Sequence, residues 1–197
     1  MQGKGCLAIV LLGLSTPSMA ADRDVVVGST KYPTSITAQC GGKPVRMVLT
    51  GTAMRTRWTL SVYSIASYVQ EKAAVRSPGD LAGTTAAKQL VLSFERAIDG
   101  STMAASFRDS IGMNHPAPAF SKELDALAYY MGKHPVKPGD QVRLTAIPGV
   151  GLSCQVVGAP EVMIRNVAFS RAVWDVYLGR KNLGVAIQTG LTSRLVR

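Results

Sequence analysis

Alternating apolar and polar positions in the first half of the chain predict β-strands. Between residues 88 and 96 (KQLVLSFER), leucine and phenylalanine alternate with polar residues, as in a strand with one buried face. Alternation over 45–50 and a run rich in Tyr, Val, Ile, Ser and Thr over 59–69 predict two more strands. Shorter strands, separated by turn residues, are expected at 25–27, 36–39, 141–147, 152–157 and 162–166.

The spacing of apolar residues changes after residue 98 and predicts helices. Met103, Phe107 and Ile111 recur at helical spacing after a turn and N-cap over 99–101. Further helices are expected at 119–132, 170–179 and 184–195. Strands, a helix pair, strands and a second helix pair are typical of an α+β fold, in which helices cover one face of an antiparallel sheet.

The first twenty residues have the pattern of a secretory signal peptide. Lys4 gives a positive start, residues 7–14 form a short apolar run that a proline ends, and 18–20 supply small residues for cleavage. The run is shorter than the about 20 residues that span a bilayer, although an uncleaved anchor is the alternative. We therefore predict a signal peptide over 1–20 and one exported domain over 21–197, periplasmic or extracellular, with no transmembrane segment.

The charge of the chain favours anionic partners. The formal net charge is +10, but the basic residues are scattered rather than gathered in a run with aromatic residues. No zinc-finger or helix-turn-helix pattern is present, so a nucleic-acid partner is not expected. The excess of positive charge suits solubility and attraction to anionic ligands or membrane surfaces.

Few residues suit metal or covalent chemistry. Nucleophile-elbow, P-loop and dinucleotide motifs are missing, and His115 and His134 each stand beside a proline without a metal-ligand partner at useful spacing. No metal or cofactor is therefore expected. Cys40 and Cys154 remain after cleavage of the signal. They can form a disulfide between strands or stay as two buried free thiols, and both alternatives are open.

The stretch over 49–69 contains the best candidate for a binding site. Arg55 stands between two strand-like runs, where a guanidinium offers a planar fork for a carboxylate or an enolate. Tyr63 can add a hydroxyl donor, but eight residues of straight strand would hold the two about 26 Å apart. Co-operation therefore requires a turn within 56–59. The alternative is that the arginines are solvated and that Tyr63 and Tyr68 are core aromatics.

Three segments, in order, resemble the chalcone isomerase superfamily. A small-residue turn and an arginine over 51–55 (GTAMR) precede a strand with Val62-Tyr63 and Tyr68. The runs 92–98 (LSFERAI) and 169–179 (FSRAVWDVYLG) then resemble the family's strand before the helical layer and its C-terminal helix pair. This resemblance implies an open-faced β-sandwich, which agrees with the α+β interpretation.

The resemblance also implies a division between enzymes and binding proteins. The family's enzymes pair the arginine, here Arg55, with a Thr, a Tyr, an Asn and a further Thr or Ser. In this chain those positions fall on Tyr63, Phe120, Leu127 and Val176, so several polar partners are lost. Some relatives bind fatty acids through an arginine and a tyrosine. We therefore expect an exported, non-catalytic binder of a small apolar carboxylic acid, with Arg55 and Tyr63 at its head group and the other three residues lining the cleft.

Two other functions remain open from the sequence. In an intramolecular lyase of the chalcone isomerase type, Arg55 would be catalytic and would stabilise a phenolate or a developing enolate. In an envelope interaction protein without a ligand, the protein's own side chains would fill the cleft. The position of Arg55, either in an open cavity or on the outer surface, separates these expectations.

Overall fold

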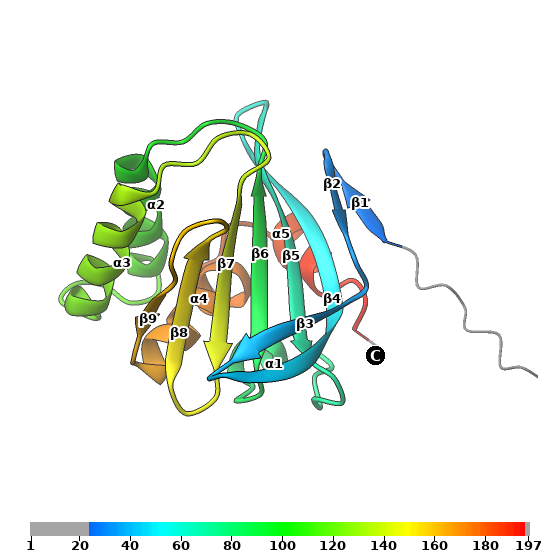
Figure 1. Cartoon of the computed structure of the whole chain (residues 1–197). Helices are drawn as coiled ribbons and strands as arrows, with labels where there is room; N and C mark the ends of the chain where they lie inside the picture. The colour runs from blue at the N-terminus through cyan, green and yellow to red at the C-terminus, as the bar shows by residue number, and fades with distance from the viewer. Residues whose placement is uncertain (1–23, 196–197) are drawn as a thin grey trace, which may run out of the picture.

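A computed structural model describes residues 24–195, so the predicted signal peptide lies outside the described residues. Figure 1 shows a strongly curled antiparallel sheet that forms a half-barrel. Its strand order follows the chain order without a crossover. The strands are β3 (Ser35–Cys40), β4 (Lys43–Arg57), β5 (Leu60–Gln70), β6 (Lys88–Phe94), β7 (Gln141–Ile147), β8 (Gly151–Val156) and β9 (Val162–Ile164). A separate hairpin of β1 (Val25–Val27) and β2 (Thr30–Tyr32) precedes them.

Five helices complete the described part of the chain, which confirms the predicted α+β class. They are α1 (Pro78–Gly83), α2 (Gly100–Gly112), α3 (Ser121–Lys133), α4 (Val167–Leu178) and α5 (Val185–Leu191). In Figure 1, α1, α4 and α5 lie behind the sheet, while α2 and α3 form a pair at one side. The α4 helix packs on β7 and β8, and α5 packs on β4 and β5.

The central strand β6 is buried along its whole length, whereas its alternating pattern predicts one polar face. Leu90 and Leu92 enter the core beneath the helices, and Val91 enters a smaller core on the opposite face. On that second face the β1–β2 hairpin lies over Ser93, whose hydroxyl accepts from the Thr30 hydroxyl (2.8 Å). There Gln89 donates to the Thr145 hydroxyl (2.7 Å), which satisfies a buried amide.

Three boundaries differ from the sequence predictions for local reasons. The β4 strand continues well beyond residue 50, so it carries Arg55 at its far end. Residues 77–80 (SPGD), which have a turn composition and belong to none of the predicted helices, begin α1, with the Ser77 hydroxyl accepting from the Asp80 N–H and a proline in the first turn. The α4 helix begins at Val167, before the predicted residue 170, because the Asn166 side chain caps it by accepting from the Phe169 N–H.

Two glycines let α5 lie directly against β4. A Cβ at Gly51 would come within 2.1 Å of the Gly190 oxygen, and one at Gly190 within 2.6 Å of the Thr52 oxygen. The Thr50 hydroxyl also donates to the Leu191 oxygen (2.9 Å). This close packing fixes the C-terminal segment behind the strand that carries Arg55.

Candidate functional site

The turn required between Arg55 and Tyr63 is present as the hairpin of β4 and β5. Trp58 and Thr59 form its two-residue turn. Arg55 is the cross-strand partner of Tyr63, so the two side chains are neighbours on one face of the sheet. The register shifts just after Arg55, an irregularity of the kind that redirects side chains near binding sites.

Arg55 is half-buried and held by the backbone behind it. Its Nη1 donates to the Leu183 oxygen (3.1 Å), in the segment that joins α4 to α5. The Leu183 N–H in turn donates to the Val176 oxygen (3.0 Å). A guanidinium has five N–H donors, and this contact uses one of them. None of the three ion pairs among residues 24–195 involves Arg55.

Two tyrosine hydroxyls stand beside this guanidinium. Burial raises the pKa of Tyr63, while the neighbouring Tyr177 hydroxyl and the positive charge of Arg55 act to lower it. Burial raises the pKa of Tyr177 well above its ordinary value, and Tyr63 adds to that rise. Both phenols are therefore neutral at physiological pH and can donate a hydrogen bond to an anion.

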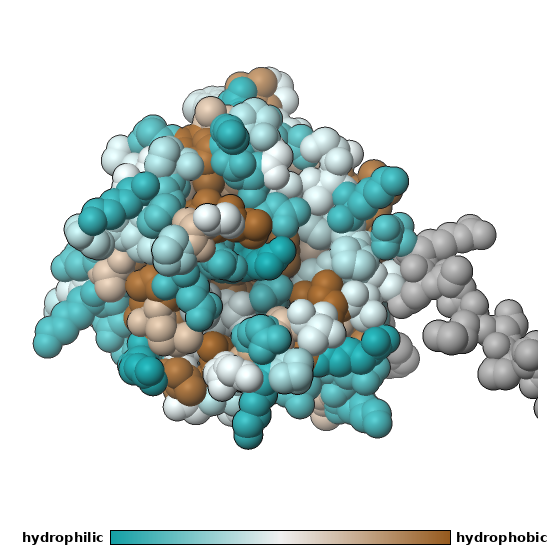
Figure 2. Space-filling view, viewed as in Figure 1, coloured by the Kyte–Doolittle hydropathy of each residue, from teal (hydrophilic) through white to brown (hydrophobic). Residues whose placement is uncertain are grey.

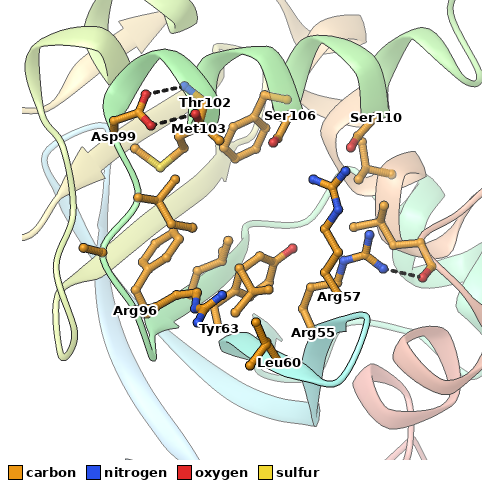
Figure 3. Close-up of a pocket in the computed structure, with 18 of the residues that line it drawn as sticks. Arg55, Arg57, Leu60, Tyr63, Arg96, Asp99, Thr102, Met103, Ser106 and Ser110 are labelled. Carbon is orange, nitrogen blue, oxygen red and sulfur yellow. Dashed lines mark hydrogen bonds between the residues drawn. The ribbon is translucent and has the colours of Figure 1, made fainter.

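These residues border a cavity of about 350 Å³ between the sheet and α2. Figure 3 shows Arg55 and Arg57 together on one side, Arg96 on the other, and residues of α2 along the top. The walls are largely hydrophobic side chains from the sheet, from α2 and from α4 and the segment after it, including Leu92, Phe94, Ile98, Met103, Phe107, Val176 and Leu183. Such a volume lies at the small end of the about 300–1,000 Å³ range of ligand pockets.

The charge around the cavity favours an anion. Three arginines border it, and Asp99 is the one acidic residue among the residues that line it. The Asp99 carboxylate accepts from the Ser101 hydroxyl (2.6 Å) and the Thr102 N–H (2.8 Å), where it caps α2. These hydrogen bonds hold its pKa well below the ordinary value. Asp99 is therefore ionised, but three guanidinium groups against one carboxylate leave a net positive charge around the cavity.

Two of the expected cleft residues lie elsewhere. Val176 lines the cavity, whereas Phe120 and Leu127 do not. Phe120 starts α3 and packs against the rings of His115 (5.3 Å between centroids) and Phe169 (5.6 Å). Leu127 is buried in the core on α3. The reason is that α2, not α3, borders the cavity.

Several residues that line the cavity are not predicted by the sequence. In the sequence, Arg57 and Arg96 are members of the scattered basic set, and Tyr177 is one position in a helical pattern. Arg57 is two residues beyond Arg55 on the same strand, which is a signal for a shared face. For Tyr177 and Arg96 no local signal exists, because only the packing of α4 against the sheet and the pairing of β6 with β5 bring them to the cavity.

The two cysteines follow the second of the two alternatives. Cys40 and Cys154 are buried free thiols. They belong to different cores, Cys40 on the β1–β2 side of the sheet and Cys154 beneath the helices, so a bond between them would have to pass through the sheet. Burial raises the pKa of both thiols, which keeps them protonated.

Neither histidine borders the cavity. His115 Nε2 lies 3.3 Å from the Asp175 carboxylate, and His134 Nδ1 lies 2.7 Å from the Tyr130 oxygen. Over residues 24–195, no three His, Cys, Asp or Glu side chains are grouped as metal ligands. Within the same range, no helix has the length and apolar character needed to cross a bilayer.

A second hollow of about 370 Å³ lies on the opposite face of the sheet. Its walls are mostly amide and hydroxyl side chains, several of them already paired. For example, the Ser153 hydroxyl donates to the Glu161 carboxylate (2.6 Å). Polar surface exceeds apolar surface in this hollow, whereas the reverse holds at Arg55, so the cavity at Arg55 is the better candidate for a ligand with a hydrocarbon part.

The curled sheet with its helices is similar to the fold of a solved structure. A crystal structure of a fatty-acid binding protein from Arabidopsis thaliana superposes with a TM-score of 0.63 over 87% of this chain and 97% of that chain. The two sequences are 16% identical, so this likeness shows the shared fold.

The family follows from the sequence match. The chalcone isomerase-like family model matches residues 25–192, and the chain belongs to this family. Among curated proteins, no sequence matches the chain.

Proposed function

We propose that the protein is an exported, non-catalytic binder of a small apolar carboxylic acid of the fatty-acid type. The observation that carries this proposal is the position of Arg55, which has unused donors next to the neutral Tyr63 hydroxyl in an apolar cavity. A carboxylate placed there receives charge-assisted hydrogen bonds, and its hydrocarbon part lies against Leu92, Phe94 and the residues of α2.

The size and charge of the cavity define the ligand further. About 350 Å³ suits a short or medium-length chain better than a long one. The surrounding arginines favour an acid over an alcohol or an ester. The name of the structural neighbour, a fatty-acid binding protein, supports the same class of ligand. Export rests on the signal-peptide pattern over residues 1–20.

The test is a direct comparison of decanoic acid and decanol by calorimetry. Wild type should bind the acid more tightly, and Arg55→Gln should lose about 10- to 100-fold of the acid affinity, the value of a charge-assisted hydrogen bond. Decanol affinity should change little. Arg143→Gln is the matched control, because Arg143 lies beside the second hollow on the other face. Equal acid affinity in wild type and Arg55→Gln would exclude the proposed head-group site.

Lipid extraction and mass spectrometry of the purified protein give an independent readout. Recovery of carboxylic acids from wild type, and their loss from Arg55→Gln, would support the proposal. The isomerase alternative predicts instead that chalcone absorbance disappears faster than it does spontaneously and that this rate falls in Arg55→Gln. The alternative without a ligand requires a filled cleft, whereas the described cavity is open space beside Arg55.

A further inference from the structure

The tip of the β4–β5 hairpin exposes large apolar side chains. Trp58 is 90% exposed and has a φ of +59°, a conformation that glycine adopts more easily. Leu60, two residues later, is 48% exposed. Figure 1 shows this hairpin projecting beyond the rest of the sheet, and Figure 2 shows hydrophobic surface at the same end of the molecule. These two side chains bury little apolar surface within the fold, so the stability of the fold does not explain why large apolar residues occupy the tip.

The same tip is positively charged and opens onto the candidate ligand cavity. Trp58 and Leu60 both border that cavity, together with the exposed Arg57 and Arg96. Neither arginine takes part in an ion pair or a side-chain hydrogen bond recorded for residues 24–195. An apolar tip flanked by unpaired guanidinium groups matches the interface of an anionic bilayer, in which aromatic rings lie at the head-group level and arginines bind phosphates.

We propose that this tip, defined by Arg57, Trp58, Leu60 and Arg96, docks on an anionic lipid bilayer and opens the cavity toward the membrane. Trp58 and Leu60 enter the interfacial region, and the two arginines contact lipid phosphates. The exchange of an acid between membrane and cavity rests on the proposed function, but the docking itself does not. A protein partner fits less well, since a standard interface buries about 800 Å² per partner and a hairpin tip is much smaller.

The chain contains its own reporter of docking. It has two tryptophans, and Trp174 is fully buried, so a change in emission on adding vesicles reports on Trp58. The purified protein is mixed with phosphatidylcholine vesicles, with or without phosphatidylglycerol, and some vesicles carry brominated acyl chains that quench tryptophan at short range. We expect binding to the anionic vesicles, a shift of emission to shorter wavelength and quenching by the brominated lipid.

Matched variants isolate the tip. Trp58→Ala should weaken binding to anionic vesicles about tenfold or more, the value of burying a large apolar side chain. Tyr129→Ala, which removes another exposed aromatic side chain on α3, should have no effect. Arg57→Glu should weaken binding about tenfold, whereas Lys43→Glu, the same charge change at the opposite end of β4, should weaken it much less.

Each outcome decides one of the two proposals. Three results would overturn the docking. They are equal vesicle binding by wild type and Trp58→Ala, equal binding to anionic and neutral vesicles, and absence of quenching by brominated lipid. If decanoic acid binds but anionic vesicles do not, the docking is wrong and the proposed function stands. If vesicles bind through Trp58 but decanoic acid does not bind, the docking stands and the proposed function is wrong.

Discussion

Two cations lie between the sheet and its helices, and they differ in how their donors are used. Lys88 is 3% exposed, and its Nζ donates to the Leu81 (2.9 Å) and Ala82 (2.7 Å) oxygens at the end of α1. Its ammonium also lies 5.0 Å from the centroid of the Trp174 ring. Arg55 has one recorded hydrogen bond and borders a cavity. Lys88 is thus fully buried with its ammonium held by the fold, whereas Arg55 is half-buried and has unused donors beside open space.

The comparison separates a cation that serves the fold from one whose remaining donors the fold leaves unused. The last carbonyls of a helix lack intrahelical partners, and Lys88 satisfies two of them inside the core. The pKa of Lys88 is lowered to about 8, mainly by burial and also by the charge of Arg171, while Asp175 opposes the shift. The hydrogen bonds from Lys88 to the carbonyl groups at the end of α1 therefore offset the cost of burying its charge. No such structural role accounts for the free donors of Arg55.

Charge reversal at the two sites is the strongest test of this difference. Lys88→Glu places a carboxylate against two carbonyl oxygens in the core, so the free energy of unfolding should fall by about 4 kcal/mol or more. Arg55→Glu should cost about 1 kcal/mol, the value of its single hydrogen bond, while abolishing decanoic acid binding. Urea denaturation measures the first effect and calorimetry the second. Similar losses of stability at both sites would remove the distinction.

The pH dependence of stability provides a second, smaller test. Because the pKa of Lys88 is about 8 in the folded protein and near its ordinary 10.5 when unfolded, the unfolded state binds more protons between these values. The cost of the buried charge is fully present below pH 8 and disappears as the pH rises toward 10.5. Between pH 7.5 and 9.5 this gain is about 2 kcal/mol. Urea denaturation at both pH values measures it.

Lys88→Met is the variant that isolates this effect. The buried thiols Cys40 and Cys154 act in the opposite direction, since their raised pKa values make stability fall once unfolded thiols ionise. Wild type should therefore gain about 2 kcal/mol relative to Lys88→Met between pH 7.5 and 9.5. Lys43→Met, at an exposed position, should leave the pH dependence of wild type unchanged. A constant gap between wild type and Lys88→Met would contradict a lowered pKa.

The same two cations show what the sequence can predict. Arg55 was identifiable because it stands at the end of a strand pattern, next to small residues, with a tyrosine eight positions later. The β4–β5 hairpin makes Arg55 and Tyr63 neighbours across two strands. The alternation of apolar and polar residues is enough to predict those two strands. Lys88 is the first residue of the pattern that predicts β6, and the pattern alone indicates an ordinary polar residue at the end of a strand. Its burial depends on α1, a short helix that the residues 77–80 suggest only as a turn.

The walls of the cavity were harder to predict than its head group. Phe120 and Leu127 belong to an apolar helix face that fits several packing arrangements equally well. Which helix borders the cavity depends on how the α2–α3 pair sits against α4, and that is decided by packing rather than by periodicity. Periodicity identifies buried faces, but it does not specify the partner of each face.

The smallest expected effects concern the hydroxyls of Tyr63 and Tyr177. They test which of the two hydroxyls donates a hydrogen bond to the ligand. Tyr63 and Tyr177 are close enough for each hydroxyl to affect the pKa of the other. Tyr63 is also the cross-strand partner of Arg55, so we expect its hydroxyl to be the one that donates to the carboxylate. Tyr63→Phe should weaken decanoic acid binding about fivefold, the value of one neutral hydrogen bond, and leave decanol binding less affected.

Tyr177→Phe should have a smaller effect, because it removes only the support of the Tyr63 hydroxyl. Calorimetry of the two single variants and of the double variant measures the coupling. If Tyr177 acts through Tyr63, the double variant binds the acid no more weakly than Tyr63→Phe alone. Fully additive losses would mean instead that both hydroxyls donate to the ligand, so that the head group is held by three side chains rather than by Arg55 and Tyr63.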